Sequence, residues 1–299
     1  MLNSTSPTQP TVVSLANYSY LTTIGDKAIH FLQGQLSCDV NLLSTEQTVM
    51  GAYLNIQGRI ITTLRLLRHN DQLLLQLPSN LSELVSQKLN RIAMLSRVKL
   101  QPSDDLQTIG IIGQHAGEQL QRYFTTIPTV PLQSIHEHGL TLIRITSNEQ
   151  FMLIGSAESI TAFAQQVRLS DGSFNDWLLQ LIAAKLVEID AFTSEQFTPH
   201  EIGLPEQGAV SFTKGCYVGQ EIVARMQYLG KLKQHLQLLH WHTPPVCQRL
   251  DKVFNQDHKA VGQIAVIAQY HNQQSALVVL RDDHVGALLF TSQHEALNH

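Results

Sequence analysis

The chain has 299 residues, more than a single hydrophobic core usually supports, so we expect about two or three domains. Charged residues make up only 15% of it, and 20 Lys and Arg against 24 Asp and Glu give a net charge of −4. Because this balance provides no basic footprint, we expect neither direct binding to nucleic acid nor binding to an anionic membrane.

The first ten residues, MLNSTSPTQP, are polar and lack the basic and apolar regions of a signal peptide. No stretch approaches the ~20 apolar residues that span a bilayer. We therefore predict a cytoplasmic protein with a disordered tail over residues 1–10. Its three cysteines, Cys38, Cys216 and Cys247, lie far apart and form no C-x-x-C pair, which predicts neither a disulfide framework nor a metal site.

Apolar periodicity predicts a first group of elements between residues 26 and 92. A helix over Asp26–Leu36 precedes two strands, Thr48–Leu54 and Arg59–Arg68, and Gly58 suits the turn between them. A third strand, Gln72–Leu77, leads to an amphipathic helix. The apolar stripe of that helix is Leu81, Leu84, Val85, Leu89 and Ile92, and its expected cap is Ser79 or Asn80.

A second group of strands and helices is expected between residues 107 and 189. Its elements are a strand at Gln107–Ile112, a helix at Gly117–Phe124, strands at Leu140–Thr146 and Phe151–Ile154, a helix near Ala157–Val167 and a helix at Phe174–Ile189. Strands accompanied by helices twice over, with antiparallel hairpins available, predict an α+β fold across residues 11–229, in two subdomains.

Beyond Gly230 the pattern changes to short strands only. They are expected at Leu232–Trp241, Val261–Ala268, Ala276–Leu280 and Gly286–Phe290, separated by turn-rich segments. We therefore place a domain boundary near residue 230 and predict a small β-barrel or sandwich over residues 230–299.

The densest chemical signal is the run SFTKGCYVGQEIVAR. An apolar strand over Ala209–Phe212 is expected to enter a glycine-flanked loop that carries Cys216 and precedes a helix. A thiol near a helix N-terminus and beside Lys214 has a lowered pKa and is reactive, whereas a buried cysteine, the alternative, is inert. Glu221 and Arg225 lie four residues apart, and this spacing alone predicts an ordinary helical ion pair.

The motif KGCYVGQEIVAR, together with FLQGQLSCDV at Phe31–Val40, resembles the signature of the YgfZ family. The likeness continues in order through Gly58-Arg59, the helix that carries Trp177, FTPHEIGL at Phe197–Leu204, the cysteine loop and Val261-Gly262. That family consists of folate-binding proteins that are similar to the glycine-cleavage aminomethyltransferase and are linked to iron–sulfur protein maturation and tRNA modification.

The resemblance implies an aminomethyltransferase-like folate-binding fold, with domains in a ring around a channel for tetrahydrofolate. It makes Cys216 the functional thiol, with Lys214 beside it. It implies that Trp177 contacts the folate, and it places Tyr18, otherwise a half-buried aromatic residue, where related proteins have a second tryptophan. The expected partners are iron–sulfur assembly factors or client iron–sulfur enzymes. Three more candidate cofactor-binding residues belong to the same motif: Gln220, Glu221 and Arg225.

The chain departs from the family after Trp177. Where the family has a segment resembling R-I-E-A-G-I-P, this sequence reads LIAAKLV, so Ala183 replaces an acidic residue that can hold a pterin through paired hydrogen bonds. Lys185 and Val187 replace the glycine and the proline, and we expect the helix to continue through them. Because no carboxylate for aminomethyl transfer is evident, an accessory role is favoured over an enzyme.

Three functions therefore stay open. The first is a folate-binding accessory factor in iron–sulfur cluster assembly or repair, and the second is a tetrahydrofolate-dependent one-carbon transferase. The third is a thiol hydrolase that pairs Cys216 with His200 or His235. The histidine pairs within His136–His138 and His240–His242 lack a third ligand at a helpful spacing, so they predict solvated strand histidines rather than a metal site.

Overall fold

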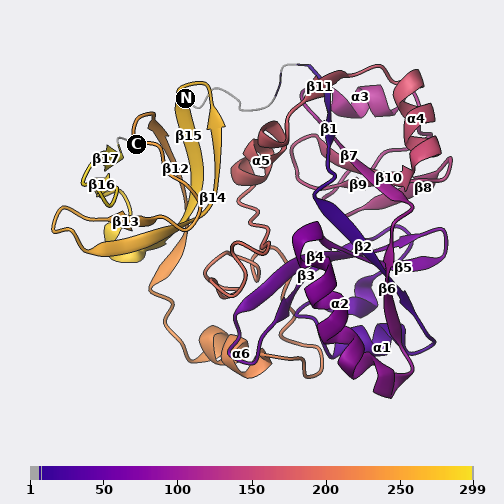
Figure 1. The fold of residues 1–299 in the computed structure, drawn as a ribbon, viewed down its shortest axis with the longest axis horizontal. Helices are drawn as coiled ribbons and strands as arrows, with labels where there is room; N and C mark the ends of the chain where they lie inside the picture. Colours follow the sequence, from indigo (N-terminus) through magenta and orange to yellow (C-terminus); the bar gives the residue numbers. More distant parts are fainter. Residues whose placement is uncertain (1–6, 8, 298–299) are drawn as a thin grey trace.

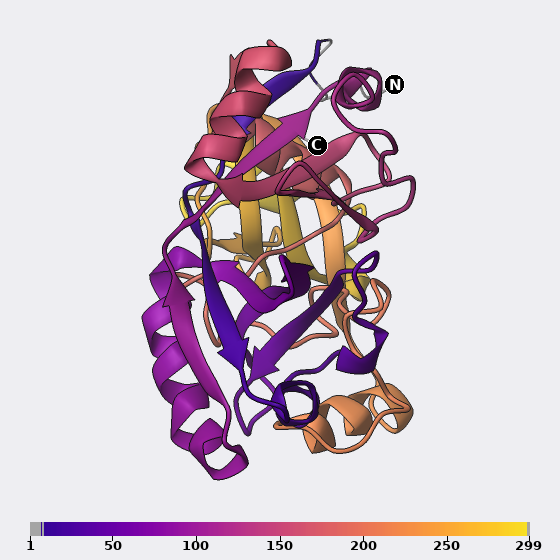
Figure 2. The same cartoon turned by 90° about the vertical axis from the view of Figure 1, so that its right-hand side faces the viewer.

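The computed structural model describes residue 7 and residues 9–297, which contain three β-sheets (Figure 1). Figure 2 shows the first two sheets one above the other, with the third sheet behind them. Within these residues, no helix is both long and apolar enough to span a bilayer. Of the tail predicted over residues 1–10, residues 1–6 and 8 lie outside the description. The carbonyl of Pro7 accepts a hydrogen bond from the backbone N–H of Gln114, so this part of the tail is held in place.

The first sheet is antiparallel, and its helices share one hydrophobic core with it. Its strand order is β3-β4-β5-β2-β6. The helices and strands predicted between residues 26 and 92 are present, with somewhat different bounds. The strands β2 and β6 of this sheet were not predicted. The bounds are β2 (Tyr18–Ile24), β3 (Val49–Leu54), β4 (Ile60–His69), β5 (Gln72–Pro78), β6 (Lys99–Ser103), α1 (Ala28–Gln33), α2 (Ser79–Ala93), and the 3-10 turns η1 (Val40–Leu42) and η2 (Met94–Ser96).

The helix α2 buries a narrower stripe than the sequence pattern predicts. Leu84 and Ile92 are 42% and 41% exposed, although both belong to the expected stripe. A helix that packs on a single sheet covers only the side chains that point directly at that sheet. The N-cap of α2 is Pro78, so the expected capping by Ser79 or Asn80 is wrong.

The second sheet has the order β11-β1-β7-β10-β9-β8 and is antiparallel except for the β1–β11 pair. Two helices pack against it around a cluster that includes Phe124, Phe151 and Phe163. The first of these helices is shorter than the sequence predicts. The bounds are β1 (Thr11–Ser14), β7 (Leu106–Ile112), β8 (Ser134–Glu137), β9 (Leu140–Arg144), β10 (Gln150–Ser156), β11 (Ser170–Gly172), α3 (Ala116–Leu120) and α4 (Ala157–Gln166).

The third sheet is a curled half-barrel, which confirms in part the small β-barrel or sandwich expected from the sequence, because the barrel is not fully closed. Its order is β12-β15-β14-β13-β16-β17, and in the part of the chain described here no pairing joins β12 to β17. The last two strands have only two residues each, too few to reach round and close the sheet. The bounds are β12 (Gln234–His242), β13 (Lys252–Phe254), β14 (Ala260–Tyr270), β15 (Gln273–Arg281), β16 (Leu289–Phe290), β17 (Ala296–Leu297) and the 3-10 turn η3 (Asp282–His284).

The helix α5 (Phe174–Ala183) lies where the three sheets meet and contacts β1, β14 and β15 (Figure 1). A capping box fixes its start, because the Ser173 hydroxyl accepts a hydrogen bond from the Asp176 N–H and the Asp176 carboxylate accepts one from the Ser173 N–H. This position lets the helix contribute side chains to the junction of all three sheets.

The end of α5 corrects the expectation of a longer helix. Lys185 adopts a left-handed conformation with φ +55, and its N–H bonds to the carbonyl of Ile182 at 3.0 Å. The N–H of Leu186 bonds to the carbonyl of Leu181 at 2.9 Å, which completes a Schellman motif. A lysine thus occupies the position that glycine usually takes, and the helix stops there. The chain then runs irregularly to α6 (Gln220–Tyr228), and the strand expected at Ala209–Phe212 does not form.

Candidate functional site

The cysteine loop, residues 209–219, is irregular and is attached to the segment that follows α1. The Ser211 N–H donates to the carbonyl of Ser37 at 2.9 Å, and the Ser37 hydroxyl donates to the carbonyl of Ala209 at 2.7 Å. Cys216 is exposed, and nothing lies within 4 Å of a Cβ built on the neighbouring Gly215. The loop therefore presents this thiol to the outside of the molecule.

The two other thiols are buried. Burial raises the pKa of Cys38 to about 12 and the pKa of Cys247 to about 11. Cys38 also packs tightly on β3, where a Cβ added to Gly51 would lie 2.4 Å from its sulfur. Of the three cysteines, only Cys216 is accessible to a reagent or a partner.

The Lys214 side chain points to the segment after α1, and its effect on Cys216 stays a prediction. Its ammonium group donates to the carbonyl oxygens of Gln33, Leu36 and Cys38, each at 2.6 Å. An ammonium group has three N–H donors, so these contacts use all of them. Burial lowers the pKa of Lys214. The residue is a positioning residue that holds the cysteine loop on the end of α1.

The helix α6 begins beside the loop at Gly219, which has φ +79. A Cβ at this position would lie 2.6 Å from the carbonyl oxygen of Asn55, so only glycine fits the close approach. The side-chain oxygen of Gln220 accepts a hydrogen bond from the backbone of the loop. Glu221 and Arg225 are exposed, and among the described residues no ion pair joins them. The ion pair expected from their spacing is therefore wrong.

A cavity of about 400 Å³, which we call the central cavity, lies between the first sheet, α5 and the third sheet. Its residues come from the starts of β2 and α2, from α5, from the segment after α5, and from the third sheet and the loop before β13. None of them lies on the cysteine loop or on α6. The lining residues are Asn17, Tyr18, Pro78, Ser79, Asn80, Phe174, Leu178, Leu181, Leu186, Glu188, Asp190, Cys247, Gln248, Arg249, Ala265, Val266 and Ile267.

Glu188 connects the cavity wall to a buried arginine. Its carboxylate accepts a hydrogen bond from the hydroxyl of Tyr18 and a 2.7 Å contact from the guanidinium of Arg65. Arg65 also donates to the side-chain oxygen of Gln76 at 3.1 Å. Burial, reinforced by the charge of Glu188, raises the pKa of Tyr18 well above its usual value, so this hydroxyl stays protonated as a donor.

Asp190 forms a second charged pair at the cavity, with Arg249 at 2.8 Å. Arg249 also stacks over the ring of Phe192, at 5.0 Å from its centroid. Burial opposes ionisation of Asp190, but the hydrogen bond from Arg249 lowers the pKa of this carboxyl overall. The pair joins the segment after α5 to the loop before β13.

Trp177 lies beneath the wall of the cavity rather than on its surface. Its ring is fully buried, and a Cβ added to Gly110 would lie 2.5 Å from it. Its indole N–H makes no hydrogen bond of ordinary geometry among the described residues, but it interacts with the hydroxyl of Tyr18. From α5, Phe174, Leu178 and Leu181 reach the cavity instead. The contact between Trp177 and folate stays a prediction, and this conformation leaves the ring no exposed face.

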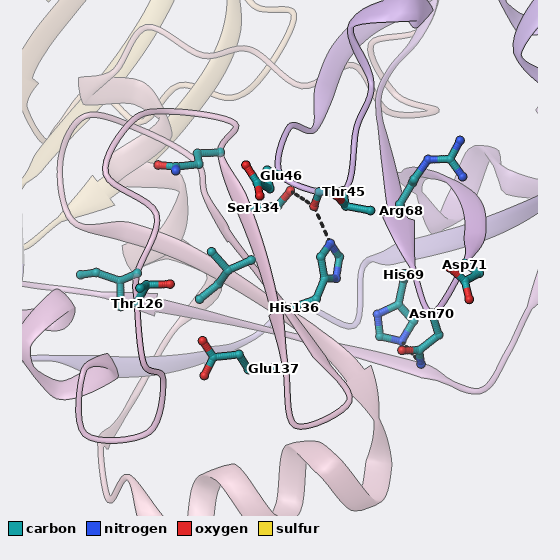
Figure 3. A pocket seen from close by; sticks show the side chains of 13 residues that line it. Thr45, Glu46, Arg68, His69, Asn70, Asp71, Thr126, Ser134, His136 and Glu137 are labelled. Atoms are coloured by element: carbon teal, nitrogen blue, oxygen red, sulfur yellow. Dashed lines mark hydrogen bonds between the residues drawn. The ribbon is translucent and has the colours of Figure 1, made fainter.

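A larger cavity, of about 660 Å³, lies between the β4–β5 hairpin and β8 (Figure 3). Its hydrogen bonds join the first two sheets: His136 bonds to the carbonyl of Thr45 at 2.6 Å, and the hydroxyl of Thr141 lies 2.8 Å from His136 and 2.7 Å from His69. In the described part of the chain, no group of three or more metal-ligating side chains gathers. This cavity contains none of the expected site residues.

The structure separates the expected site residues into two groups. Tyr18 lines the central cavity, whereas Cys216, Lys214 and the three α6 residues belong to the other region. Among the described residues, no hydrogen bond joins Cys216 to either histidine considered as a base: His200 bonds to Gln227 through Nε2, and His235 bonds to Asp282 through Nδ1. The thiol hydrolase stays a hypothesis.

Sequence reasoning missed three charged residues that line the cavity and the buried arginine behind its wall. Glu188 could have been noticed as a single carboxylate within the apolar run Leu186–Ile189. It was missed because a helix was expected to continue through these residues. The others are distant in sequence, and only the fold brings them together. The four residues are Arg65, Glu188, Asp190 and Arg249.

The chain is similar to several curated proteins along most of its length. It is 31% identical over 280 residues to the tRNA-modifying protein YgfZ of Hamiltonella defensa, covering 90% of this chain and 82% of that protein. It is 30% identical over 298 residues to the tRNA-modifying protein YgfZ of Yersinia pestis, covering 93% and 90%. No family model matches the sequence.

Among solved structures, the fold resembles the glycine cleavage system aminomethyltransferase T from Bartonella henselae. The TM-score is 0.79 at 14% sequence identity, and the match covers 98% of this chain and 85% of that chain. The likeness confirms the expected aminomethyltransferase-like fold.

Proposed function

This chain belongs to the YgfZ family, and from that premise we propose that it is a folate-binding accessory protein in iron–sulfur cluster assembly or repair. Cys216 is its functional thiol, and the central cavity is its folate site. We place it in the cytoplasm, where its partners are iron–sulfur assembly factors or client iron–sulfur enzymes.

The observation that carries the proposal is the contrast among the three cysteines. Cys216 alone is exposed, on a loop that Lys214 holds to the rest of the protein. A thiolate is a good ligand for the iron of a cluster, but one thiolate is too few to hold a cluster. The partner supplies the other thiolates, so an exposed position for Cys216 is required.

The residues of the central cavity fit a folate. Its volume of about 400 Å³ lies within the range of small-molecule sites. Leu178, Leu181 and Leu186 offer apolar surface to a flat ring, and the carboxylate of Glu188 offers acceptors to ring N–H groups. Arg249, at 38% exposure, offers a cation to the acidic tail of a folate. When bound, a reduced folate supplies a carrier for one-carbon units.

The name of the relatives refers to tRNA modification, and we propose that this chain affects tRNA modification indirectly. Its net charge is −4, so it has no overall excess of positive charge for the RNA backbone. Enzymes that modify tRNA and depend on iron–sulfur clusters would then be its clients.

The test uses cells that lack the protein and receive it back as wild type, as Cys216→Ser or as Cys38→Ala. Serine keeps the shape of cysteine without its metal affinity, so Cys216→Ser should lose support of iron–sulfur enzymes while the purified variant still binds tetrahydrofolate. Cys38→Ala removes a buried thiol and should keep that support. Full support by Cys216→Ser would overturn the proposal.

A second measurement separates this proposal from the one-carbon transferase. The purified protein is incubated with tetrahydrofolate and candidate methylamine donors, and the products are followed by mass spectrometry. Tetrahydrofolate binding without turnover supports the accessory role. Catalytic turnover would favour the transferase instead.

A further inference from the structure

Two carboxylates line the central cavity, and they differ in their capacity for a ligand. Asp190 accepts hydrogen bonds from the N–H groups of Phe192 and Thr193, from the Thr193 hydroxyl and from Arg249. Three of these bonds reach Oδ1 and only that from Arg249 reaches Oδ2, so Asp190 has no free acceptor site on Oδ1 and cannot offer one acceptor site from each oxygen.

Glu188 is only half satisfied by comparison. One of its oxygens accepts from the Tyr18 hydroxyl, and the other accepts from Arg65. About two lone-pair sites therefore stay free. The side chain is 18% exposed and lines the cavity, so a ligand there can reach it.

The surroundings fix the direction of the Glu188 carboxylate before any ligand arrives. Arg65 is 5% exposed and is held by Gln76, whose amide nitrogen donates to the hydroxyl of Tyr20 at 3.1 Å. Tyr18 is buried and donates from a second side. A group held from two sides loses little freedom on binding, which favours affinity.

We propose that Glu188 binds the donor edge of a heterocycle that presents an amino group and a ring N–H side by side, as the 2-amino-4-oxopyrimidine ring of a pterin does. The two free acceptor sites match two parallel N–H donors, in the way a carboxylate receives the paired N–H groups of arginine. This inference rests on the proposed folate site and names the residue that recognises the ring.

The position of Ala183 supports this assignment. The family resemblance implies an acidic residue there, yet Ala183 is exposed on the last turn of α5 and does not line the cavity. The Schellman motif at Lys185 turns the chain after that helix, and the segment beyond it brings Glu188 to the cavity wall. The carboxylate that holds the ring is thus supplied from a different position along the chain.

The test combines two ligands with three proteins by titration calorimetry. The ligands are tetrahydrofolate and its 2-desamino-2-methyl analogue, which lacks the amino donor. The proteins are wild type, Glu188→Gln and Ala183→Glu, each checked for folding by its melting temperature without ligand. Wild type should bind tetrahydrofolate about ten- to a hundredfold more tightly than the analogue, as expected for a hydrogen bond to a charged group. Glu188→Gln should lose most of this difference, and Ala183→Glu should keep it.

The outcomes separate this inference from the folate proposal. If wild type binds both ligands equally well, the assignment of Glu188 is overturned while the folate site stands; this result needs no variant and holds even if Glu188→Gln fails to fold. A tenfold gain for tetrahydrofolate in Ala183→Glu would also overturn it. If wild type binds neither ligand, the folate proposal and this inference fall together.

Discussion

The cysteine loop and the central cavity are built in opposite ways. In the loop, Cys216 is exposed, and the charged group of Lys214 donates its three N–H bonds to backbone carbonyls. In the cavity, the charged groups are paired with one another, and Glu188 keeps part of its acceptor capacity for a ligand. One region is suited to meet another macromolecule, and the other is suited to enclose a small molecule. The two roles should therefore be separable by mutation.

The largest effect is expected in the cavity. Arg65→Met removes the main partner of Glu188 and leaves a largely buried carboxylate with one hydroxyl, so the free energy of unfolding should fall by about 3–5 kcal/mol. Urea denaturation at pH 7 measures this loss. Adding Glu188→Gln to Arg65→Met should recover part of it, because the unpaired charge is then gone. A loss below about 1 kcal/mol would place this pair among ordinary surface ion pairs.

The next largest effect is expected in the rates at which the three thiols are alkylated. At pH 8, iodoacetamide should modify Cys216 at least about a hundredfold faster than Cys38 or Cys247, because only thiolates react and burial raises the pKa of the other two to about 12 and about 11. Mass mapping after short reaction times gives the order. Raising the pH toward 11 should increase the labelling of Cys247 before that of Cys38. Early labelling of either buried thiol in the folded protein would contradict the comparison.

A smaller effect is expected from the support of the loop. Lys214→Met leaves three carbonyl oxygens without their donor, and the free energy of unfolding should fall by about 1–3 kcal/mol. The exposed Lys231 provides the control, since Lys231→Met should change stability by no more than about 0.5 kcal/mol. If the two variants prove equally stable, Lys214 does not hold the loop.

The smallest effect concerns the ion pair between Asp190 and Arg249, whose side chains are 21% and 38% exposed. Arg249→Met should cost about 0.2–1 kcal/mol at pH 7. Because the folded pKa of Asp190 lies below its ordinary value of 3.8, this contribution is present above pH 3.8 and is lost as the pH falls through the folded pKa. Urea denaturation at pH 7, 5 and 3.5 should show the difference from wild type narrowing only at the lowest pH.

Local patterns predicted most elements of the fold because their information is short-range. The hairpin at Gly58, which has φ +73, needs only a residue free to adopt that conformation, and the α2 stripe repeats within one helix. Strands such as β2 escaped prediction because the sheet buries both of their faces, so their sequences do not alternate. The expected β-barrel is confirmed only in part: the sheet curls, but its last strands, β16 and β17, have two residues each and the barrel is not fully closed.

The site was harder to predict than the fold, since its contacts join distant parts of the chain. The flanking glycines predicted that Cys216 lies on a loop, but the direction of the Lys214 side chain depends on carbonyls about 180 residues away. Glu188 was missed because a left-handed lysine ended the helix at a position where the sequence suggested continuation. Propensity scales favour the opposite outcome, because they rank lysine among the good helix formers.

The Lys214 contacts also bear on how the protein is made. They join residues that lie 176 to 181 positions apart, so Gln33 leaves the ribosome long before its ammonium partner is synthesised. At about 5–20 residues per second, this delay lasts roughly 10 to 35 seconds. During that interval the nascent chain has neither Lys214 nor Cys216. Lys214 and Cys216 are translated within three residues of each other. A Cys216 loop without the Lys214 contacts therefore exists only briefly in a newly made chain.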